Sequence, residues 1–542
     1  MAADTAFKRS SAPDISLPWR RPPIPTGVND FNARAGFLRY YAGLRFAGFV
    51  LEVDWDDDGQ FSQAYDDIGD LTMSIECRRG RDYASQLVGR AATGQLQALL
   101  RNTSGRFSSF YTASPIYGKI LPSRKVRFRM AAPYGAVLWT GFLDRIEPQT
   151  ATADGIPMVM LYASGPFRQI SNNKVSPPAQ FGGTTGVVIG ALLDEAGWPA
   201  GDRTIDAGQH EMGRWYIEDR DAIPALQEIE DTEVGFLYEG LAWDFIFEAR
   251  YNRILNHLVS EATFSDNAGA ALSYRNVSQS DPLREIFNEM VIQVQPYHLG
   301  ASAVLWTLTG ETPIIAPAGG SRTYIAQYPN VSSGGAQGAY VSSWTTPVVG
   351  TDITQTGVAN GDLAVTVSKT ATKMFITITN NHATLGAQIT LLQARGIPVV
   401  KDNPYQVISE DTTSQGKYDV RSYPYTAPWF LNEAYAKSAS DYFISRQKDP
   451  RPVLAIEIAS NKALAYYNQA ASRKISSRVT LVANQSRTML GINGDFYIES
   501  IAHRLSAHEG FRTFFELSQA EADPAYWQLD VDLLGVGTKL AY

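Results

Sequence analysis

The sequence predicts a mainly β protein with α+β segments, divided into several domains. Short runs of β-branched and aromatic residues recur along the 542 residues, and turns rich in glycine separate them. Hydrophobic residues make up 44% of the chain and charged residues 19%, which is typical of a chain with folded cores. At usual domain sizes, this length corresponds to about three or four domains.

The overall charge and the cysteine content argue against several classes of protein. A net charge of -8 argues against a dedicated nucleic-acid-binding protein. Cys77 is the single cysteine, so an intrachain disulfide cannot form and a zinc site is not expected. Residues 1–20 lack the continuous apolar core of a secretory signal, and no window approaches the ~18 apolar residues of a membrane span. We therefore expect a chain that is soluble until it assembles.

Residues 1–34 predict an extended N-terminal arm, because prolines favour an open backbone. The prolines are Pro13, Pro18, Pro22, Pro23 and Pro25. Two interpretations stay open for this arm. It is either a disordered tail or a segment that orders against a neighbouring subunit.

Residues 35–167 predict a first β unit of the size of a small barrel or sandwich. Apolar and polar residues alternate at 71–77 and again at 125–130, as the two faces of a strand require. Further strands are expected at residues 46–53, 95–100, 137–143 and 157–162.

Residues 168–284 change to a mixed α+β pattern, which predicts a middle domain. Thr184 or Thr185 is expected to cap a helix that Gly197 and Pro199 would end. A second helix is expected from Ala222 to about Asp231. A hairpin is expected at residues 235–240 and 242–248.

The rest of the chain predicts a second β unit, split by an insertion. This unit comprises residues 285–299, with a strand at 289–295, and residues 401–542. Residues 300–400 are poor in charge and rich in Gly, Ser and Thr, and they predict an inserted β-sandwich-like module with strands at 363–367, 373–379 and 388–392. Later strands are expected at 453–458, 478–482, 495–505 and 511–517.

The clearest helical pattern spans residues 431–446, within the second β unit. One face of this helix is marked by Leu431, Ala434, Tyr435, Tyr442 and Phe443. Pro450 follows the expected end.

The acidic stretch Asp54-Trp-Asp-Asp-Asp-Gly59 matches the opening of a calcium loop, D-x-D-x-D-G. Such a loop also needs a bidentate carboxylate at its twelfth position, where this chain has Tyr65. Asp66 and Asp67 come one and two places too late. Since Asp and Gly also build tight turns, we expect an acidic hairpin turn here and no metal site.

Motifs that would indicate catalysis or cofactor binding are missing from the sequence. His503 and His508 lie close in sequence, but a metal site needs a third ligand and none stands nearby. Neither a phosphate-binding loop nor a G-x-S-x-G nucleophile motif occurs. We therefore expect no catalytic, cofactor-binding or metal-binding residues.

Two charge clusters have both a functional and a plain interpretation. A pair of carboxylates could serve glycoside hydrolysis, but a run of charges is more often solvated surface. We therefore expect a solvated helix end from Glu228, Glu230, Asp231 and Glu233. The basic run Arg78-Arg-Gly-Arg81 could contact nucleic acid, but in an acidic chain we expect it to contact an acidic neighbour at a rim.

Several stretches resemble minor tail proteins of long-tailed bacteriophages and prophages. One is an N-x-x-G-R-F-S turn within 101–108, preceded by residues 89–100 and followed by an S-P-x-Y-G loop at 114–118. The other stretches are residues 121–124, 139–146, 376–381, 391–396 and 494–503. Each match is moderately specific, and their shared order from about residue 50 to 520 makes the resemblance. The N-terminal arm lies outside it.

The resemblance implies a tail-tip, or baseplate, hub protein. Related hub proteins carry two tube-like β-barrels per chain, so three chains present six barrels and match a sixfold tail tube to a threefold tip. The implied partners are the distal tail protein or tail tube, the tape measure protein, and tail fibre or tip proteins. DNA would pass through the lumen without sequence-specific binding, and an acidic lumen would not adhere to phosphate.

We therefore expect a structural, non-enzymatic virion protein that forms a homotrimer at the tail tip and is assembled in the host cytoplasm. Core or interface positions are expected for Trp139, Phe142, Phe496 and Tyr497, with the core favoured. Two alternatives stay open. One is a tail-associated cell-wall or glycan hydrolase, and the other is a receptor- or glycan-binding adhesin that uses the module at 300–400.

Overall fold

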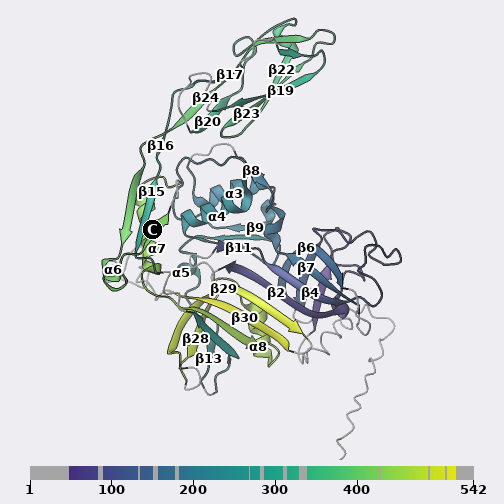
Figure 1. Ribbon diagram of the computed structural model, residues 1–542, viewed down its shortest axis with the longest axis vertical. Coiled ribbons are helices and arrows are strands. Elements are labelled where there is room, and N and C mark those ends of the chain that lie inside the picture. Colours follow the sequence, from purple (N-terminus) through teal and green to yellow (C-terminus); the bar gives the residue numbers. More distant parts are fainter. Residues whose placement is uncertain are drawn as a thin grey trace, which may run out of the picture.

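The computed structural model describes residues 48–520, except for 83–89, 132–134, 150–156, 178–181, 268, 281–285, 309–313, 329–338, 426–428, 486–488 and 507–508. The expected arm at residues 1–34 lies outside the described residues. The described chain is mainly β, which confirms the predicted fold class. The inserted module stands at one end of the long axis, and strands of the N- and C-terminal regions lie at the other end (Figure 1).

The N-terminal β unit is an antiparallel sheet in the strand order β1-β5-β6-β7-β4-β2. Its strands are β1 (Phe49–Val53), β2 (Thr72–Asp82), β4 (Gln95–Arg101), β5 (Lys125–Met130), β6 (Val137–Gln149) and β7 (Met158–Ser164), with the short β3 (Arg90–Ala91) beside β2 and a 3-10 turn at Gly69–Leu71. Along β5 and β7 every second side chain is buried, because successive side chains of a strand point to opposite faces. Trp139 and Phe142 are buried, as predicted.

The C-terminal β unit contains β27 (Val453–Ala459), β28 (Arg478–Ala483), β29 (Ile492–Ser506) and β30 (Gly510–Gln519). Two short strands that the sequence pattern placed in the middle domain also belong to this sheet. β13 (Thr263–Ser265) pairs with β28, and β14 (Asn276–Ser280) pairs with β27. Phe496 and Tyr497 are buried here, as predicted.

A single long strand, β29, connects the two β units. Its first half pairs with β28 and its second half pairs with β2, while β30 follows it along its length. The two units therefore share one 13-stranded sheet. Helix α8 (Leu464–Ser472) supports the connection, because Tyr467 lies in the N-terminal core and Tyr466 in the C-terminal core.

The middle unit packs two helices over a small sheet. Helix α3 (Thr185–Ala196) starts after Thr184, although the Thr184 side chain forms no capping hydrogen bond. It ends as predicted, and Gly197 closes it in the left-handed conformation with φ of +82°. Helix α4 (Ala222–Glu233) shares its core with the hairpin of β11 (Phe236–Glu239) and β12 (Phe245–Glu248). The smaller elements are β8 (Lys174–Val175), β9 (Arg203–Ile205), β10 (Arg220–Asp221), α5 (Asn252–Asn256) and 3-10 turns at Pro166–Gln169 and Ala200–Asp202.

A separate three-stranded sheet lies beside the middle unit (Figure 1). It consists of β15 (Glu289–Val294), β25 (Tyr405–Glu410) and β26 (Ser422–Tyr425), with α6 (Thr412–Tyr418) nearby and α7 (Glu433–Gln447) packed on β15 and β25. The sequence pattern grouped β15 and α7 with the second β unit instead. Periodicity identifies a strand but not its partner, so this grouping could not be seen in the sequence.

Helix α7 buries a face that differs in part from the predicted one. Tyr442 and Phe443 are buried as expected, and Tyr435 is half-buried. The prediction is wrong for Ala434, which is exposed, and for Leu431, which is 45% exposed and precedes the Asn432 cap. The Asn432 side chain accepts a hydrogen bond from the Tyr435 amide, so the helix starts after Leu431.

The inserted module consists of two sheets around a common core. The long strand β24 (Ala387–Lys401) organises one sheet, and the other has the order β19-β23-β22. The remaining strands of the first sheet are β16 (Tyr297–Leu299), β17 (Ala303–Thr307), β18 (Ile314–Ala316), β20 (Tyr340–Thr345) and β21 (Ile353–Thr356). The second sheet holds β19 (Ser321–Gln327), β22 (Leu363–Lys369) and β23 (Lys373–Asn380), with a 3-10 turn at Asn360–Asp362. Leu392 of one sheet and Ile376 of the other share this core.

Candidate functional site

The acidic end of helix α4 is largely buried, so the prediction of a solvated helix end is wrong for two of its members. Glu230 and Glu233 are 2% and 0% exposed. Glu228 and Asp231 lie nearer the surface, where they pair with Arg220 and Arg90. Burying a carboxylate costs stability unless charged or hydrogen-bonding groups compensate it. Glu230 and Glu233 therefore need such groups around them.

Glu230 belongs to a buried set of charged and polar side chains where three units meet, which we call the junction network. The network comprises Arg81, Glu230, Tyr238, Glu248, Arg253, Ser476, Glu499 and Ser518. Arg81 comes from β2 of the N-terminal unit, Glu230 from α4 of the middle unit, and Glu499 from β29 of the C-terminal unit. One guanidinium therefore contacts carboxylates of two other units, at 3.3 Å from Nη2 to Glu230 and 3.3 Å from Nη1 to Glu499.

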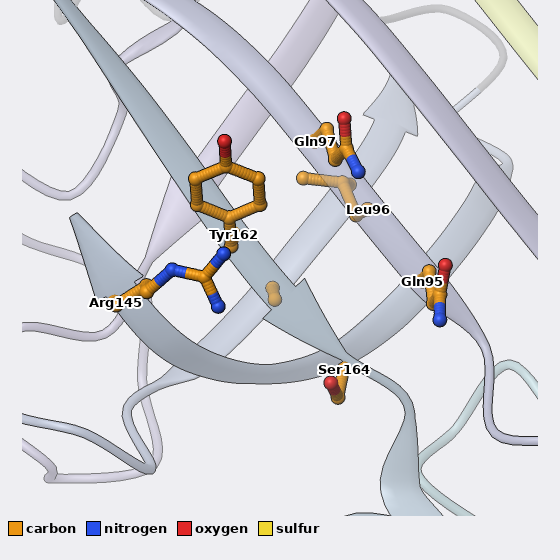
Figure 2. Close-up of a pocket in the computed structure, with 7 residues that line it drawn as sticks. Gln95, Leu96, Gln97, Arg145, Tyr162 and Ser164 are labelled. Atoms are coloured by element: carbon orange, nitrogen blue, oxygen red, sulfur yellow. The ribbon is translucent and has the colours of Figure 1, made fainter. Parts of the chain in front are cut away.

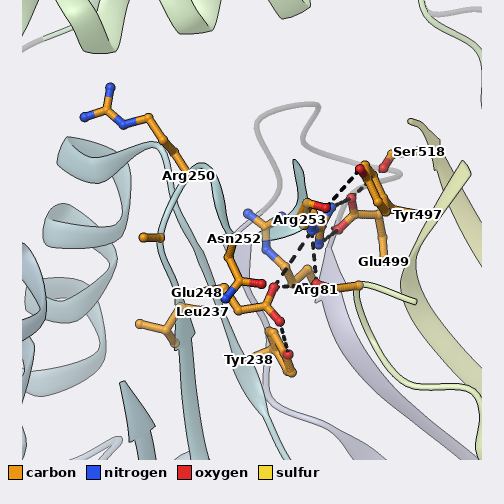
Figure 3. A network of polar contacts seen from close by, with 12 residues as sticks. Arg81, Leu237, Tyr238, Glu248, Arg250, Asn252, Arg253, Tyr497, Glu499 and Ser518 are labelled. Carbon is orange, nitrogen blue, oxygen red and sulfur yellow. Dashed lines mark hydrogen bonds and ion pairs between the residues drawn. The ribbon is translucent and has the colours of Figure 1, made fainter. Parts of the chain in front are cut away.

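A second guanidinium, that of Arg253, binds the same Glu499 carboxylate through two nitrogens (Figure 3). Nη2 donates to Oε2 at 3.0 Å, and Nη1 donates to Oε1. The Ser518 hydroxyl also donates to Glu499 Oε1, at 2.6 Å. This paired geometry is the strong form of a carboxylate–arginine contact, and it joins α5 of the middle unit to the C-terminal sheet.

Glu248 of β12 extends the network through hydroxyl groups. It accepts hydrogen bonds from the Tyr238 hydroxyl at 2.6 Å and from the Ser476 hydroxyl at 2.5 Å. Ser476 in turn accepts from Arg253 Nε at 3.0 Å. The chain of contacts therefore runs from the middle unit to the segment that precedes β28.

A local irregularity of β29 directs Glu499 into the network. The register between β29 and β30 shifts between Ile498 and Ser500, so Glu499 is the extra residue of a β-bulge. A bulge re-aims side chains, and here residues 496–501 are all buried instead of alternating. The Phe236 ring adds a cation–π contact to both guanidinium groups, whose carbon atoms lie 4.8 Å (Arg81) and 3.7 Å (Arg253) from its centroid.

The two carboxylates bound by Arg81 have opposite pKa shifts. Burial raises the pKa of Glu230 to about 7, and Arg81 offsets this only in part. Burial would also raise the pKa of Glu499, but Arg253 and Arg81 outweigh it and lower the pKa to about 2. Glu499 is thus the permanent anion of the network.

Glu239, at the end of β11, is a third buried carboxylate at the boundary with the N-terminal unit. It accepts hydrogen bonds from the Gly94 and Phe167 amides, both at 2.7 Å. Burial raises its pKa to about 7. A Cβ atom on Gly165 would lie 2.0 Å from Glu239 Oε2, so only glycine fits at this close approach.

Glu233, the last residue of α4, belongs to a second buried cluster of polar and charged side chains. It pairs with Arg250 and accepts a hydrogen bond from the Thr185 hydroxyl at 2.8 Å. Arg250 also contacts Nδ1 of His210 at 2.7 Å, and the His210 ring stacks on Phe430. Burial, with Arg250 beside it, lowers the pKa of His210 to about 3, so this histidine is neutral at physiological pH.

The acidic stretch at residues 54–59 forms a turn in which the described carboxylates bind groups of the protein itself. Asp54 accepts the amides of Asp58 and Gly59, at 3.2 and 2.8 Å. Asp56 pairs with Lys119 and Asp57 with Arg124. These contacts form the predicted acidic turn, but it does not connect a β-hairpin. β1 pairs with β5, and the chain after the turn meets β1 in an isolated bridge between Glu52 and Asp67.

The other residues weighed from the sequence have structural surroundings. His503 is buried, with Nδ1 3.0 Å from the Thr513 hydroxyl and its ring stacked on Phe511. His508 lies outside the described residues.

Within the basic run, Arg79 and Arg81 are buried, so the prediction of a rim contact is wrong for both of them. Arg78 stays near the surface and pairs with Glu516 of the same chain.

A shallow depression lies on the outer face of β4, β6 and β7 (Figure 2). It is lined by Gln95, Leu96, Gln97, Arg145, Tyr162, Ala163 and Ser164. The Arg145 guanidinium lies over the Tyr162 ring at 4.0 Å and pairs with Glu147, while the Ser164 hydroxyl donates to Asp144. Two of its polar side chains, those of Arg145 and Ser164, thus bind carboxylates of β6.

Within the described part of the chain, no group of three or more His, Cys, Asp or Glu side chains is placed to hold a metal ion. None of the described helices is long and apolar enough to cross a membrane.

The junction network is buried and connects the three units. Its carboxylates bind groups of the chain itself and are closed off from solvent. No local pattern in the sequence indicates this network, because Arg81 and Glu499 are 418 residues apart. The only signal was the unusual density of charge at Glu228–Glu233 and Arg78–Arg81, which we interpreted as surface.

No protein-family model and no curated protein matches the chain. Among solved structures, the chain is similar to a tail protein from Neisseria meningitidis MC58, with a TM-score of 0.45 and 10% identity over 87% of this chain and 96% of that one. It is also similar to the 43 kDa tail protein of prophage MuSo2 from Shewanella oneidensis, with a TM-score of 0.46 and 10% identity over 87% of this chain and 98% of that one.

A third similar structure is a component of the type VI secretion system of E. coli, described as similar to T4 bacteriophage tail proteins. Its TM-score is 0.38, with 8% identity over 87% of this chain and 77% of that one. The solved structures that the chain resembles thus include phage tail proteins and a secretion-system component. At this identity the likeness does not assign the chain to a family.

Proposed function

We propose that the chain is a structural, non-enzymatic subunit of a tailed-phage particle, and that three copies form a ring at the tail tip. The ring joins the sixfold tail tube to the threefold tip and lines the channel through which DNA leaves. The observation that carries this proposal is the shared 13-stranded sheet, in which two β units follow one another through β29. Three such chains would present six β units around one axis, as the sequence resemblance implies.

The junction network fits a ring subunit whose β units keep a fixed arrangement. Arg81, Glu499 and Arg253 connect the N-terminal, C-terminal and middle units through buried charged contacts. Charged groups that are buried and hydrogen-bonded hold one arrangement, because any other arrangement leaves a charge without compensation. A ring subunit that keeps a constant angle between its two β units needs such a joint.

The proposed partners follow from this location. They are the distal tail protein or tail tube, the tape measure protein, and tail fibre or tip proteins, with DNA passing through without sequence-specific contacts. The net charge of -8 fits a channel that does not adhere to phosphate. The protein would be assembled in the host cytoplasm and reside in the virion at the tail tip.

A glycan hydrolase would need a pair of carboxylates that face a cleft with room for the sugar. The buried Glu230, Glu239 and Glu499 instead accept hydrogen bonds from Arg81, Arg253 or backbone amides of their own chain. We therefore do not propose hydrolysis.

Imaging of phage particles that carry a small peptide tag at the chain's C-terminus tests the proposed location. Antibody-bound density at the tail tip is expected. Density along the tail shaft or on peripheral fibres would contradict the proposal.

A further inference from the structure

The loop between β4 and β5, residues 102–124, exposes several large apolar side chains to solvent. Phe110 is 92% exposed, and Tyr111, Tyr117 and Leu121 are 46%, 48% and 48% exposed. A single exposed apolar residue needs no explanation, but a group of aromatic side chains on one loop indicates a binding surface. We call these four residues the aromatic patch.

The backbone beneath the aromatic patch is held firmly. Phe107 and Ile116 insert into the core of the N-terminal unit. Successive turns connect the residues between them, as in the hydrogen bonds from the Ser108 amide to Gly105 O and from the Tyr111 amide to Ser108 O. Because the patch is already ordered, a partner that binds it does not pay the entropy of ordering the loop.

A negatively charged turn adjoins the loop. Lys119 pairs with Asp56 and donates to the Tyr65 hydroxyl at 2.7 Å, and Arg124 pairs with Asp57 at 2.8 Å. The turn has three adjacent carboxylates, Asp56 to Asp58, and the loop supplies two cations that pair with them, Lys119 and Arg124. The Asp57 side chain is 64% exposed. The surface beside the aromatic patch is therefore acidic.

The N-terminal arm of the same chain has the complementary chemistry. Pro22-Pro23-Ile24-Pro25 is a P-x-x-P segment, and Arg20 and Arg21 precede it. Such segments favour the polyproline II conformation and dock on aromatic surfaces at little entropic cost, while flanking arginines pair with carboxylates.

The arm is long enough to reach the loop that carries the patch in its own chain. The described chain begins at Gly48, whose carbonyl oxygen accepts a hydrogen bond from the Ala131 amide at one end of the β1–β5 pair. The loop joins β5 at Lys125, at the other end of this pair. The five paired residues span about 17 Å at ~3.3 Å per residue. The 22 residues at 26–47 can span at most about 75 Å when fully extended, which is well beyond this distance.

We propose that residues 18–25 of the arm bind the aromatic patch of the same chain, with the prolines against Phe110 and Tyr117 and the two arginines toward the acidic turn. Tethering favours the same chain over a neighbouring copy, because a short linker gives an effective concentration on the order of millimolar. The arm would thus cover an apolar surface that otherwise faces water.

Tryptic cleavage of the full-length protein between Arg20 and Arg21, followed by mass spectrometry, tests this contact. The double variant Phe110→Ser/Tyr117→Ser is expected to be cut there ~10-fold faster than the native chain, because aromatic anchors dominate such contacts. A charge-reversed variant, Asp57→Lys/Asp58→Lys, is expected to be cut about 3-fold faster, because the arginines lose their acidic partner. The matched control is Leu258→Ser/Val259→Ser, which removes two exposed apolar side chains elsewhere and should leave the rate unchanged.

Equal cleavage of the native chain and the aromatic double variant would overturn the proposal. So would equal acceleration by the control pair, since the effect would then not depend on the aromatic patch. Protection that disappears on dilution of the native chain would overturn binding within one chain, because an intramolecular contact does not depend on concentration.

Discussion

Glu499 is the side chain on which the joint between the units depends most, since it binds Arg81 of one unit and Arg253 of another. Replacing Glu499 with Gln keeps the shape but leaves two buried guanidinium groups without their shared anion. We expect Glu499→Gln to lower the free energy of unfolding by about 3–5 kcal/mol, the cost of breaking a buried ion pair. Urea unfolding followed by circular dichroism measures this.

The matched control is Glu76→Gln, which removes an exposed partner of Arg504 between the same two strands, β2 and β29. Exposed pairs contribute about 0–1 kcal/mol, so this variant should unfold almost like the native chain. Equal effects of the two substitutions would mean that the buried network does not hold the joint.

Glu239 gives the stability a defined pH dependence. Its pKa is about 7 in the folded chain, against about 4.3 in an unfolded chain. The folded chain therefore holds an extra proton between these values, and the stability it contributes is present below about pH 4 and is lost as the pH rises through 7. Glu239→Gln cannot titrate, so the stability of the native chain relative to this variant should fall by roughly 2–3 kcal/mol from pH 5 to pH 8. A difference that stays constant over this range would refute the raised pKa.

At the scale of elements, the sequence predicted individual strands and helices better than their partners. The alternation at Lys125–Met130 and the capped helix at Thr185–Ala196 were both visible, because periodicity and capping are local. The pairing of β29 with β2 and of β15 with β25 depends on residues far apart in sequence. For the same reason the sequence could not show that the acidic end of α4 meets Arg81, and we expected that end to be solvated.

The β2–β29 joint tolerates only glycine at position 80. Gly80 has φ of +118°, and a Cβ atom there would lie 2.4 Å from the Glu499 carbonyl oxygen. We expect Gly80→Ala to lower the thermal midpoint, with a loss of about 2–4 kcal/mol from backbone strain and the clash. Gly59→Ala is the control, because Gly59 also has positive φ but open space around it, and it should cost about 1 kcal/mol. Equal losses of stability in the two variants would show that the close approach of Gly80 to β29 does not affect stability.

At the scale of the whole molecule, the chain enters and leaves the inserted module at neighbouring positions, so we expect that the module can be deleted. Its entry strand β16 pairs with the end of β24, where Leu299 faces Val399, so the two connections lie side by side. Replacing residues 301–397 with a short glycine linker should leave the β units and their assembly intact, although the stacking of Tyr216 on Tyr340 is lost. Circular dichroism and light scattering of the deletion variant measure this, and loss of assembly would show that the module takes part in the proposed ring.

The most direct test of the proposed ring is the molar mass of the purified full-length protein by light scattering coupled to size exclusion. The account predicts three times the 59.5 kDa of one chain. A mass of 59.5 kDa at every concentration would contradict it, because a protein that stays a single chain does not form the ring we propose.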